Sequence, residues 1–207
     1  DFSVAAYVKE TMTGISDIPQ ILQDAMTQLQ QNNLPEAMAL LESVLEMAPD
    51  EFDALHILGV LKHKCGQFSQ AETLIRQAIS INNDFPDAHY NLAKVLQDQS
   101  QQEDAAVSYK NALARDPNMD VAHYNLGLIY LEQKNWQDAL ASLQQAVRIQ
   151  ADDPDYLFNL GNVYVQLEQL DKAIECYQKL VSRHPSQHIA YNNLGIAYRQ
   201  RGQLEPA

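Results

Sequence analysis

Basic residues are scarce in this chain of 207 residues, and their scarcity excludes several classes of function. The sequence has 14 Lys and Arg against 27 Asp and Glu, which gives a formal net charge of −13. A protein that follows nucleic-acid phosphates, or that is held electrostatically at an anionic membrane surface, needs clusters of Lys and Arg. We therefore expect no nucleic-acid partner and no attachment to a charged membrane surface.

Long apolar runs, glycine and proline are scarce as well. No stretch approaches the roughly 18 apolar residues of a transmembrane helix, and no basic start precedes an apolar signal segment. Only 7 Gly and 8 Pro are present, too few for a collagenous or disordered chain, and 46% of the residues are hydrophobic. The composition predicts a folded protein without membrane insertion.

The dominant feature of the sequence is a repeat of 34 residues. Offset by this length, the segments 87–93, 121–127, 155–161 and 189–195 match one another without a gap. The period divides the chain into a leader at 1–17, repeats at 18–51, 52–85, 86–119, 120–153 and 154–187, and a partial repeat at 188–207.

Each repeat contains two stretches with apolar residues at helical spacing, separated by a break near its fifteenth position. The break falls at Lys134–Asn135 in one repeat and at Gly66 and Gly202 in others. The eighth position is always small: Ala25, Gly59, Ala93, Gly127, Gly161 and Gly195. The twentieth is always alanine: Ala37, Ala71, Ala105, Ala139, Ala173 and Ala207. We expect two helices to cross at these positions, since larger side chains would force them apart.

This pattern resembles the tetratricopeptide repeat (TPR), a helix–turn–helix unit, over residues 18–207. The resemblance implies an all-α fold, a right-handed α-solenoid of stacked helix–turn–helix hairpins. Asp24 stands where the other repeats have Leu, and Gln28 stands where they often have Tyr, which is typical of a terminal capping repeat. For the leader, a docked helix and a mobile segment both stay open, and its apolar residues favour a helix.

The last repeat stops at Ala207, two or three residues into its expected second helix. We therefore interpret the chain as a fragment of a longer protein. Because Leu194, Tyr198 and Leu204 lack the rest of a covering helix, we expect residues 188–207 to fray or to self-associate.

No arrangement of catalytic or metal-binding residues stands out. Cys65 and Cys176 fall three repeats apart, which is beyond the reach of a disulfide and indicates free thiols in a reducing, cytoplasmic compartment. His56 and His63 share a helical face but lack a carboxylate cluster of ligand spacing. We expect no catalytic residue, no metal and no cofactor.

The candidate binding residues share one stripe of the first helix of each repeat, which in the family lines an inner, concave wall. The sixth position is asparagine in four consecutive repeats: Asn91, Asn125, Asn159 and Asn193. A primary amide offers both a donor and an acceptor, so a row of amides is able to pair with the backbone of an extended peptide. The row is similar to the asparagine ladder in the repeats of O-linked N-acetylglucosamine transferase, although Asn is common at this position of the family.

Apolar side chains, one further amide and one basic side chain complete the candidate peptide site. They are Tyr124, Leu128, Leu131, Phe158, Asn162 and Lys94. A contiguous apolar strip on a concave wall usually marks a partner site, while packing between helices is the alternative for Tyr124. The clamp of Lys, Asn and Arg with which family members hold acidic chaperone tails is absent, because the second and fifth positions carry no Lys.

These features predict a non-catalytic protein–protein interaction scaffold that binds a peptide or helix of a partner in the concave groove. The alternative is a substrate-recruiting arm of a larger enzyme, such as a glycosyltransferase, with its catalytic domain after residue 207. Both hypotheses include a binding groove, and they differ in whether a catalytic domain follows residue 207.

Overall fold

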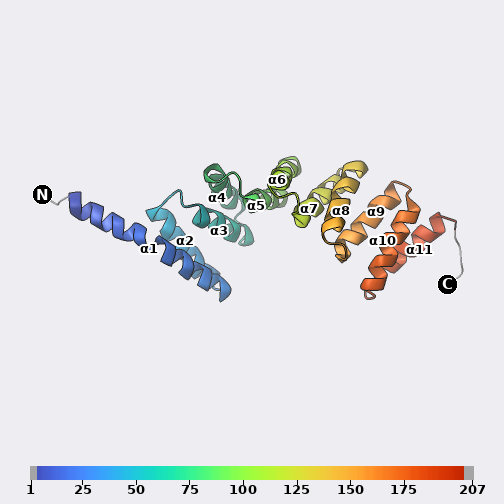
Figure 1. Ribbon diagram of the computed structural model, residues 1–207, viewed down its shortest axis with the longest axis horizontal. Helices are drawn as coiled ribbons and strands as arrows, with labels where there is room; N and C mark the ends of the chain where they lie inside the picture. Colours follow the sequence, from blue (N-terminus) through green and yellow to red (C-terminus); the bar gives the residue numbers. More distant parts are fainter. Residues whose placement is uncertain (1–3, 203–207) are drawn as a thin grey trace. The chain divides into compact units, whose positions relative to one another are not determined.

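The computed structural model describes residues 4–202, with side chains from residue 17 onwards, and this part of the chain is all-α (Figure 1). It contains no strand among the described residues. The helices are α1 (Val4–Gln30), α2 (Leu34–Met47), α3 (Phe52–Lys64), α4 (Phe68–Ile81), α5 (Pro86–Asp98), α6 (Gln102–Arg115), α7 (Asp120–Glu132), α8 (Trp136–Ile149), α9 (Pro154–Gln166), α10 (Leu170–Arg183) and α11 (His188–Gln200). None of the described helices combines the length and the apolar character needed to cross a lipid bilayer.

The chain divides into two compact parts, residues 1–108 and 109–207, which we call the N-terminal half and the C-terminal half. In the N-terminal half α1 packs on α2 and α3 on α4, while α2 also packs on α3 and α4 on α5. In the C-terminal half α7 packs on α8 and α9 on α10, while α8 also packs on α9 and α10 on α11. Each half is therefore a stack of helical hairpins, the arrangement expected of an α-solenoid.

The first helix extends further towards the N-terminus than the repeat does. α1 runs from Val4 to Gln30 without a break at the expected end of the leader, and Pro19 lies inside it. Ile18 and Ala25 join the buried core of the first hairpin, whereas Asp24 is exposed. At the other end, Leu204 and Ala207 of the partial repeat lie outside the described residues.

Glycine at the eighth position allows the two helices of a hairpin to approach closely, as predicted. A Cβ placed on Gly59 would lie 2.6 Å from Cγ1 of Ile75, and one on Gly127 would lie 2.8 Å from Cγ of Leu143. Both distances are shorter than real carbon contacts allow. The alanines at the twentieth position are fully buried in every described repeat: Ala37, Ala71, Ala105, Ala139 and Ala173. Small side chains thus mark the crossing, which confirms the expectation.

The turn inside each hairpin has the same backbone conformation in all six repeats. The fifteenth position has a positive φ at Asn32, Gly66, Ser100, Lys134, Glu168 and Gly202. After α3, the Gly66 N–H donates to His63 and the Gln67 N–H to Lys62, both at 2.9 Å, which is the paired closure of a Schellman motif. Four of the six residues are not glycine, although the left-handed region favours glycine.

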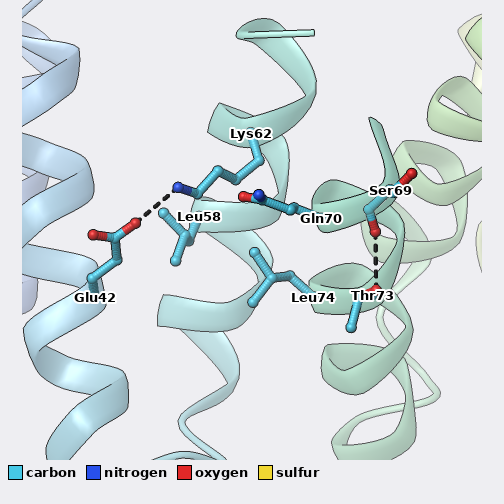
Figure 2. Close-up of a pocket in the computed structure, with 7 residues that line it drawn as sticks. All are labelled: Glu42, Leu58, Lys62, Ser69, Gln70, Thr73 and Leu74. Carbon is cyan, nitrogen blue, oxygen red and sulfur yellow. Dashed lines mark hydrogen bonds and ion pairs between the residues drawn. The ribbon is translucent and has the colours of Figure 1, made fainter. Parts of the chain in front are cut away.

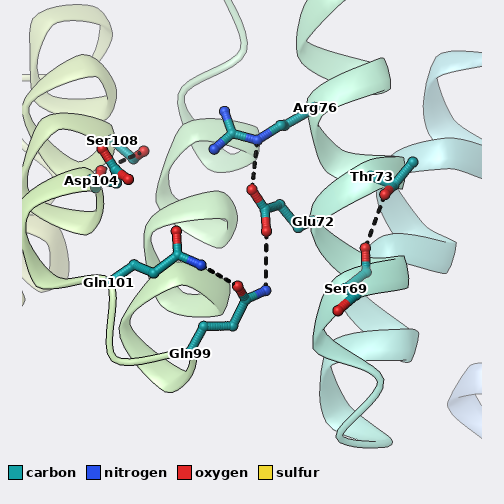
Figure 3. Close-up of polar contacts among 8 residues, drawn as sticks. All are labelled: Ser69, Glu72, Thr73, Arg76, Gln99, Gln101, Asp104 and Ser108. Atoms are coloured by element: carbon teal, nitrogen blue, oxygen red, sulfur yellow. Dashed lines mark hydrogen bonds and ion pairs between the residues drawn. The ribbon is translucent and has the colours of Figure 1, made fainter.

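Side chains reinforce one of these turns from the neighbouring hairpin (Figure 3). Gln99 comes just before the left-handed Ser100 and donates through Nε2 to a carboxylate oxygen of Glu72 on α4, at 3.1 Å. The other oxygen of Glu72 pairs with Nε of Arg76 at 2.8 Å. One carboxylate therefore ties the end of α5 to α4.

Candidate functional site

In the C-terminal half, the predicted amide row lies on three successive first helices. Asn125 on α7, Asn159 on α9 and Asn193 on α11 are all half-buried. Asn159 donates one N–H to the Asp155 carbonyl oxygen at 2.9 Å and the other to the Tyr124 hydroxyl at 3.1 Å. Since an amide nitrogen has two hydrogens, Asn159 has only its carbonyl oxygen left for a ligand.

The same kind of link joins α3 and α5 in the N-terminal half. Nδ2 of Asn91 lies 2.9 Å from Nε2 of His56, which stands at the fifth position of the preceding repeat, as Tyr124 does relative to Asn159. Burial lowers the pKa of His56, against the raising effect of Asp87 and Asp53, so the neutral ring accepts this hydrogen bond. The asparagine row therefore connects neighbouring repeats.

Tyr124 packs between α7 and α9, which was the alternative for this residue. Its ring lies beside that of Tyr156, with the centroids 4.6 Å apart. The Tyr156 hydroxyl donates to Asp120 at 2.9 Å, and burial raises the pKa of Tyr124. The ring and its hydroxyl both contribute to the interface between repeats, and the side chain is half-buried.

A cavity of about 210 Å³ opens between α9 and α11, within the C-terminal half. It is lined by Asn162, Val165, Gln166, Tyr177, Asn193 and Ile196. Oδ1 of Asn162 accepts two hydrogen bonds, from the Tyr177 hydroxyl at 2.7 Å and from Nδ2 of Asn193 at 3.1 Å. The amide hydrogens of Asn162 and the carbonyl oxygen of Asn193 have no partner within the described part of the chain. The cavity thus offers a hydrogen-bond donor and an acceptor, with Val165 and Ile196 as apolar walls.

Tyr177 reaches this cavity because Gly161 has no side chain. Tyr177 lies on α10, and a Cβ on Gly161 would be 2.6 Å from its Cε1 atom. The ring is fully buried at the helix crossing, and burial raises the pKa of its phenol to about 12. The hydroxyl is therefore a neutral donor that fixes the orientation of the Asn162 amide.

The other predicted residues lie elsewhere. Phe158 packs against the buried cluster of Leu157, Leu180 and Ala190, with its ring centroid 6.4 Å from that of Tyr177. Leu131 packs against the main core of the C-terminal half, and Leu128 is half-buried on α7.

Two predicted residues, Asn91 and Lys94, belong to α5 in the N-terminal half. Lys94 is half-buried, and Asn91 lines a separate cavity there.

Sequence reasoning missed Tyr177, because it took candidate binding residues only from the first helix of each repeat. A signal was present, since Gly161 and Tyr177 are sixteen residues apart, the same spacing as Gly59 and Ile75. Tyr177 occupies the position that Ile75 has in the N-terminal half, and its ring passes Gly161 so that the hydroxyl reaches Asn162.

A larger cavity, of about 480 Å³, lies between α2, α3 and α4 (Figure 2). Leu58 and Leu74 supply its apolar surface, and an ion pair of 2.8 Å joins Lys62 to Glu42 across it. Because Lys62 and Glu42 already pair with each other, this cavity offers a ligand fewer free polar groups than the cavity between α9 and α11 does.

Neither the cysteines nor the histidines form a reactive centre among the residues that the structure describes. Cys65 and Cys176 are free thiols, and burial raises the pKa of Cys176 to about 11. No described group of three or more His, Cys, Asp and Glu side chains is placed to hold a metal ion.

Comparisons with known proteins agree with this architecture. Models of the tetratricopeptide repeat match residues 28–95 and 118–186, and a model described as TPR repeat matches residues 96–134. No curated protein sequence matches the chain.

Several solved structures share the fold. One is YrrB, described as a TPR protein with an unusual peptide-binding site, at 20% identity and a TM-score of 0.74, covering 90% of this chain and 96% of that one. A second is MamA from Desulfovibrio magneticus RS-1, at 20% identity and a TM-score of 0.74, covering 83% and 97%. A third is the C-terminal part of a TPR repeat-containing protein from Cytophaga hutchinsonii, at 18% identity and a TM-score of 0.77, covering 87% and 71%. From the repeats, the hairpins and these matches, we conclude that the chain belongs to the tetratricopeptide repeat family.

Proposed function

We propose that this protein is a non-catalytic interaction module, and that the cavity between α9 and α11 binds an extended segment of a partner protein. The observation that carries the proposal is the polar centre of that cavity. Asn162 has two unused amide hydrogens and Asn193 an unused carbonyl oxygen, between the apolar side chains of Val165 and Ile196.

These groups match the chemistry of one peptide unit. A backbone carbonyl of the ligand accepts from Asn162, and a neighbouring backbone N–H donates to Asn193. The ligand side chain beside that unit is apolar and packs between Val165 and Ile196. Because the polar contacts involve backbone, the cavity fixes the position of an extended segment while tolerating several sequences.

The amide of Asn162 is held in place before a ligand arrives, since its oxygen accepts from both Tyr177 and Asn193. Such preorganisation lowers the entropic cost of binding. The peptide-binding site named for YrrB adds support from a protein of the same fold.

Selection of a random peptide library against the protein, followed by affinity measurement for the strongest peptide, tests the proposal. Asn162→Asp keeps the oxygen that accepts from Tyr177 and removes both amide hydrogens. We expect it to weaken the peptide about fivefold or more, since the lost hydrogen bond is worth about 1 kcal/mol.

Ile196→Asp should weaken the same peptide by a similar factor, because it places a carboxylate in the apolar wall. Ile189→Asp is the matched control, because Ile189 lies on the same helix, is 66% exposed and does not line the cavity. Equal affinities for all three variants and the parent protein would place the binding site elsewhere.

A further inference from the structure

The N-terminal half contains a separate cavity of about 400 Å³, lined by residues from α1, α2, α3 and α5 and by the turn after α1. Ile57, Val60 and Leu61 of α3 form its apolar surface together with Leu29 and Leu34. Leu61 belongs to the buried core of this half, and Ile57 packs against that core. The cavity is large enough for an apolar side chain of a partner.

Unpaired charges of opposite sign line this cavity. Asp87 of α5 and Lys64 of α3 both line it, and neither has an ion-pair partner in the described part of the chain. The two residues before Lys64 do have acidic partners: Lys62 pairs with Glu42 at 2.8 Å, and His63 pairs with Asp98 at 2.6 Å. Lys64 and Asp87 are therefore the charges at this cavity that are available to a ligand.

The two charges stand towards opposite ends of the two helices that line the cavity. Asp87 is in the first turn of α5, and Lys64 is the last residue of α3. α3 and α5 run in the same direction, since one antiparallel helix separates them, so eleven positions of the repeat separate the two charges. At a rise of 1.5 Å per residue this is about 16 Å along the helix axes, to which the sideways distance between α3 and α5 adds, so a ligand needs at least roughly five extended residues to reach both charges.

Aromatic rings accompany the acidic end. The ring of Phe85 lies edge-on to that of His56, with centroids 5.3 Å apart, and both residues line the cavity with Asp87. Asp53 adds a second carboxylate close to His56. An aromatic surface beside carboxylates favours the cation of a Lys or Arg side chain, by ion pairing and by contact with the rings.

We propose that this cavity is a second peptide site that selects a bipolar segment, with a basic residue at Asp87, an apolar residue over Val60 and an acidic residue at Lys64. This inference rests on the proposed function as an interaction module, and it is independent of the cavity between α9 and α11. Charge complementarity at both ends sets its specificity, whereas the C-terminal cavity contacts backbone.

Four fluorescein-labelled peptides of eight residues test the proposal. Each has two variable positions that lie five apart with a Leu between them, and these two positions hold Lys and Glu, two Glu, two Lys, or two Gln. Fluorescence anisotropy at low ionic strength should give the peptide with Lys and Glu the tightest binding, by about fivefold over each of the others.

Variants at the two charges should change this ranking in a defined way. Lys64→Glu should make the peptide with two Lys the tightest binder, and Asp87→Lys should do the same for the peptide with two Glu. Lys64→Gln, which introduces no repulsion, should remove the advantage of the Glu end. Circular dichroism of each variant verifies that its helices remain intact.

Two controls separate this inference from the proposed function. Asp155→Lys changes the equivalent position of α9 and should leave the ranking as it is in the parent protein. Asn162→Asp should likewise leave it unchanged. If Asn162→Asp abolishes binding of these peptides while Lys64→Gln and Asp87→Lys do not change it, the C-terminal cavity is the site and the bipolar site does not exist. Equal binding of all four peptides, or binding of none, would also overturn the inference.

Discussion

The side-chain amide of Asn159 donates a hydrogen bond to the hydroxyl of Tyr124, 3.1 Å away on the first helix of the preceding repeat. Its second N–H returns to the carbonyl oxygen of Asp155 within α9. One side chain of the asparagine row thus joins two repeats and contributes to the interface between their hairpins. From the repeat pattern alone, both the amide hydrogens and the oxygen of Asn159 are expected to be free to bind a ligand. In the structure both hydrogens are already bonded, and only the oxygen is free.

A double-mutant cycle should measure this link. We expect Tyr124→Phe and Asn159→Ala each to lower the unfolding free energy, and the double variant to lose less than the sum of the two. The coupling should be about 0.5–1.5 kcal/mol, the net value of a hydrogen bond between neutral groups. Chemical denaturation of the four proteins gives the number, and strict additivity would show that the hydrogen bond contributes nothing.

Gly161→Ala should destabilise the protein by about 1–3 kcal/mol, because the new methyl group meets the buried ring of Tyr177. Gly195→Ala is the matched control, since Gly195 occupies the same position of the next repeat and, among the described residues, has no neighbouring atom within 4 Å of the added Cβ. It should be neutral or stabilising by up to about 1 kcal/mol, because alanine favours a helix. Thermal denaturation that shows the same change for both variants would disprove the close crossing at Gly161.

In the hairpin turns, in contrast, glycine should stabilise the protein. Lys134 and Glu168 have φ values of 56° and 57°, in the left-handed region. Replacing either by Gly should raise the unfolding free energy by about 0.5–1 kcal/mol, since Gly adopts this conformation without strain. Gly66→Ala should lower it by a similar amount. A loss of stability on Lys134→Gly would mean that the turn is not left-handed in solution.

The two thiols should differ strongly in reactivity. Burial raises the pKa of Cys176 to about 11, and Cys65 is exposed. Only the thiolate attacks a maleimide, so Cys176 is almost entirely in its unreactive form at pH 7–8. Mass spectrometry during labelling should show one fast modification at Cys65 and a second one at Cys176 at least about tenfold slower. Equal rates would mean that α10 opens readily around Cys176.

The helices and their crossings were predictable from the sequence, because each depends on a local pattern repeated every 34 residues. The spacing of apolar residues indicates the helices, and the small residues at Gly59, Gly127 and Gly161 indicate the crossings. The extent of α1 was not predictable, because the periodicity that marks the first repeat stops near residue 18 while the helix continues to Val4.

The candidate site was predictable only in part. Helical periodicity places Asn159 and Asn162 on one face of α9, and Asn193 on the equivalent face of α11. It does not say which hydrogen bonds their amides make. Those bonds depend on which side chain the opposite helix supplies. The spacing from Gly161 places Tyr177 at the crossing, but it does not say which amide receives the tyrosine hydroxyl. A hydroxyl from the second helix decides the orientation of Asn162 on the first.

The NMR resonances of the Asn162 and Asn193 side chains test most directly whether these amides bind a partner's backbone. The side-chain NH₂ signals of Asn162 should shift on saturation with the peptide selected from the random library. The signals of Asn135, whose amide bonds to Asp138 in the turn between α7 and α8, should stay unchanged. Shifts at Asn135 or on the second helices, with unmoved signals at Asn162 and Asn193, would contradict the proposed site.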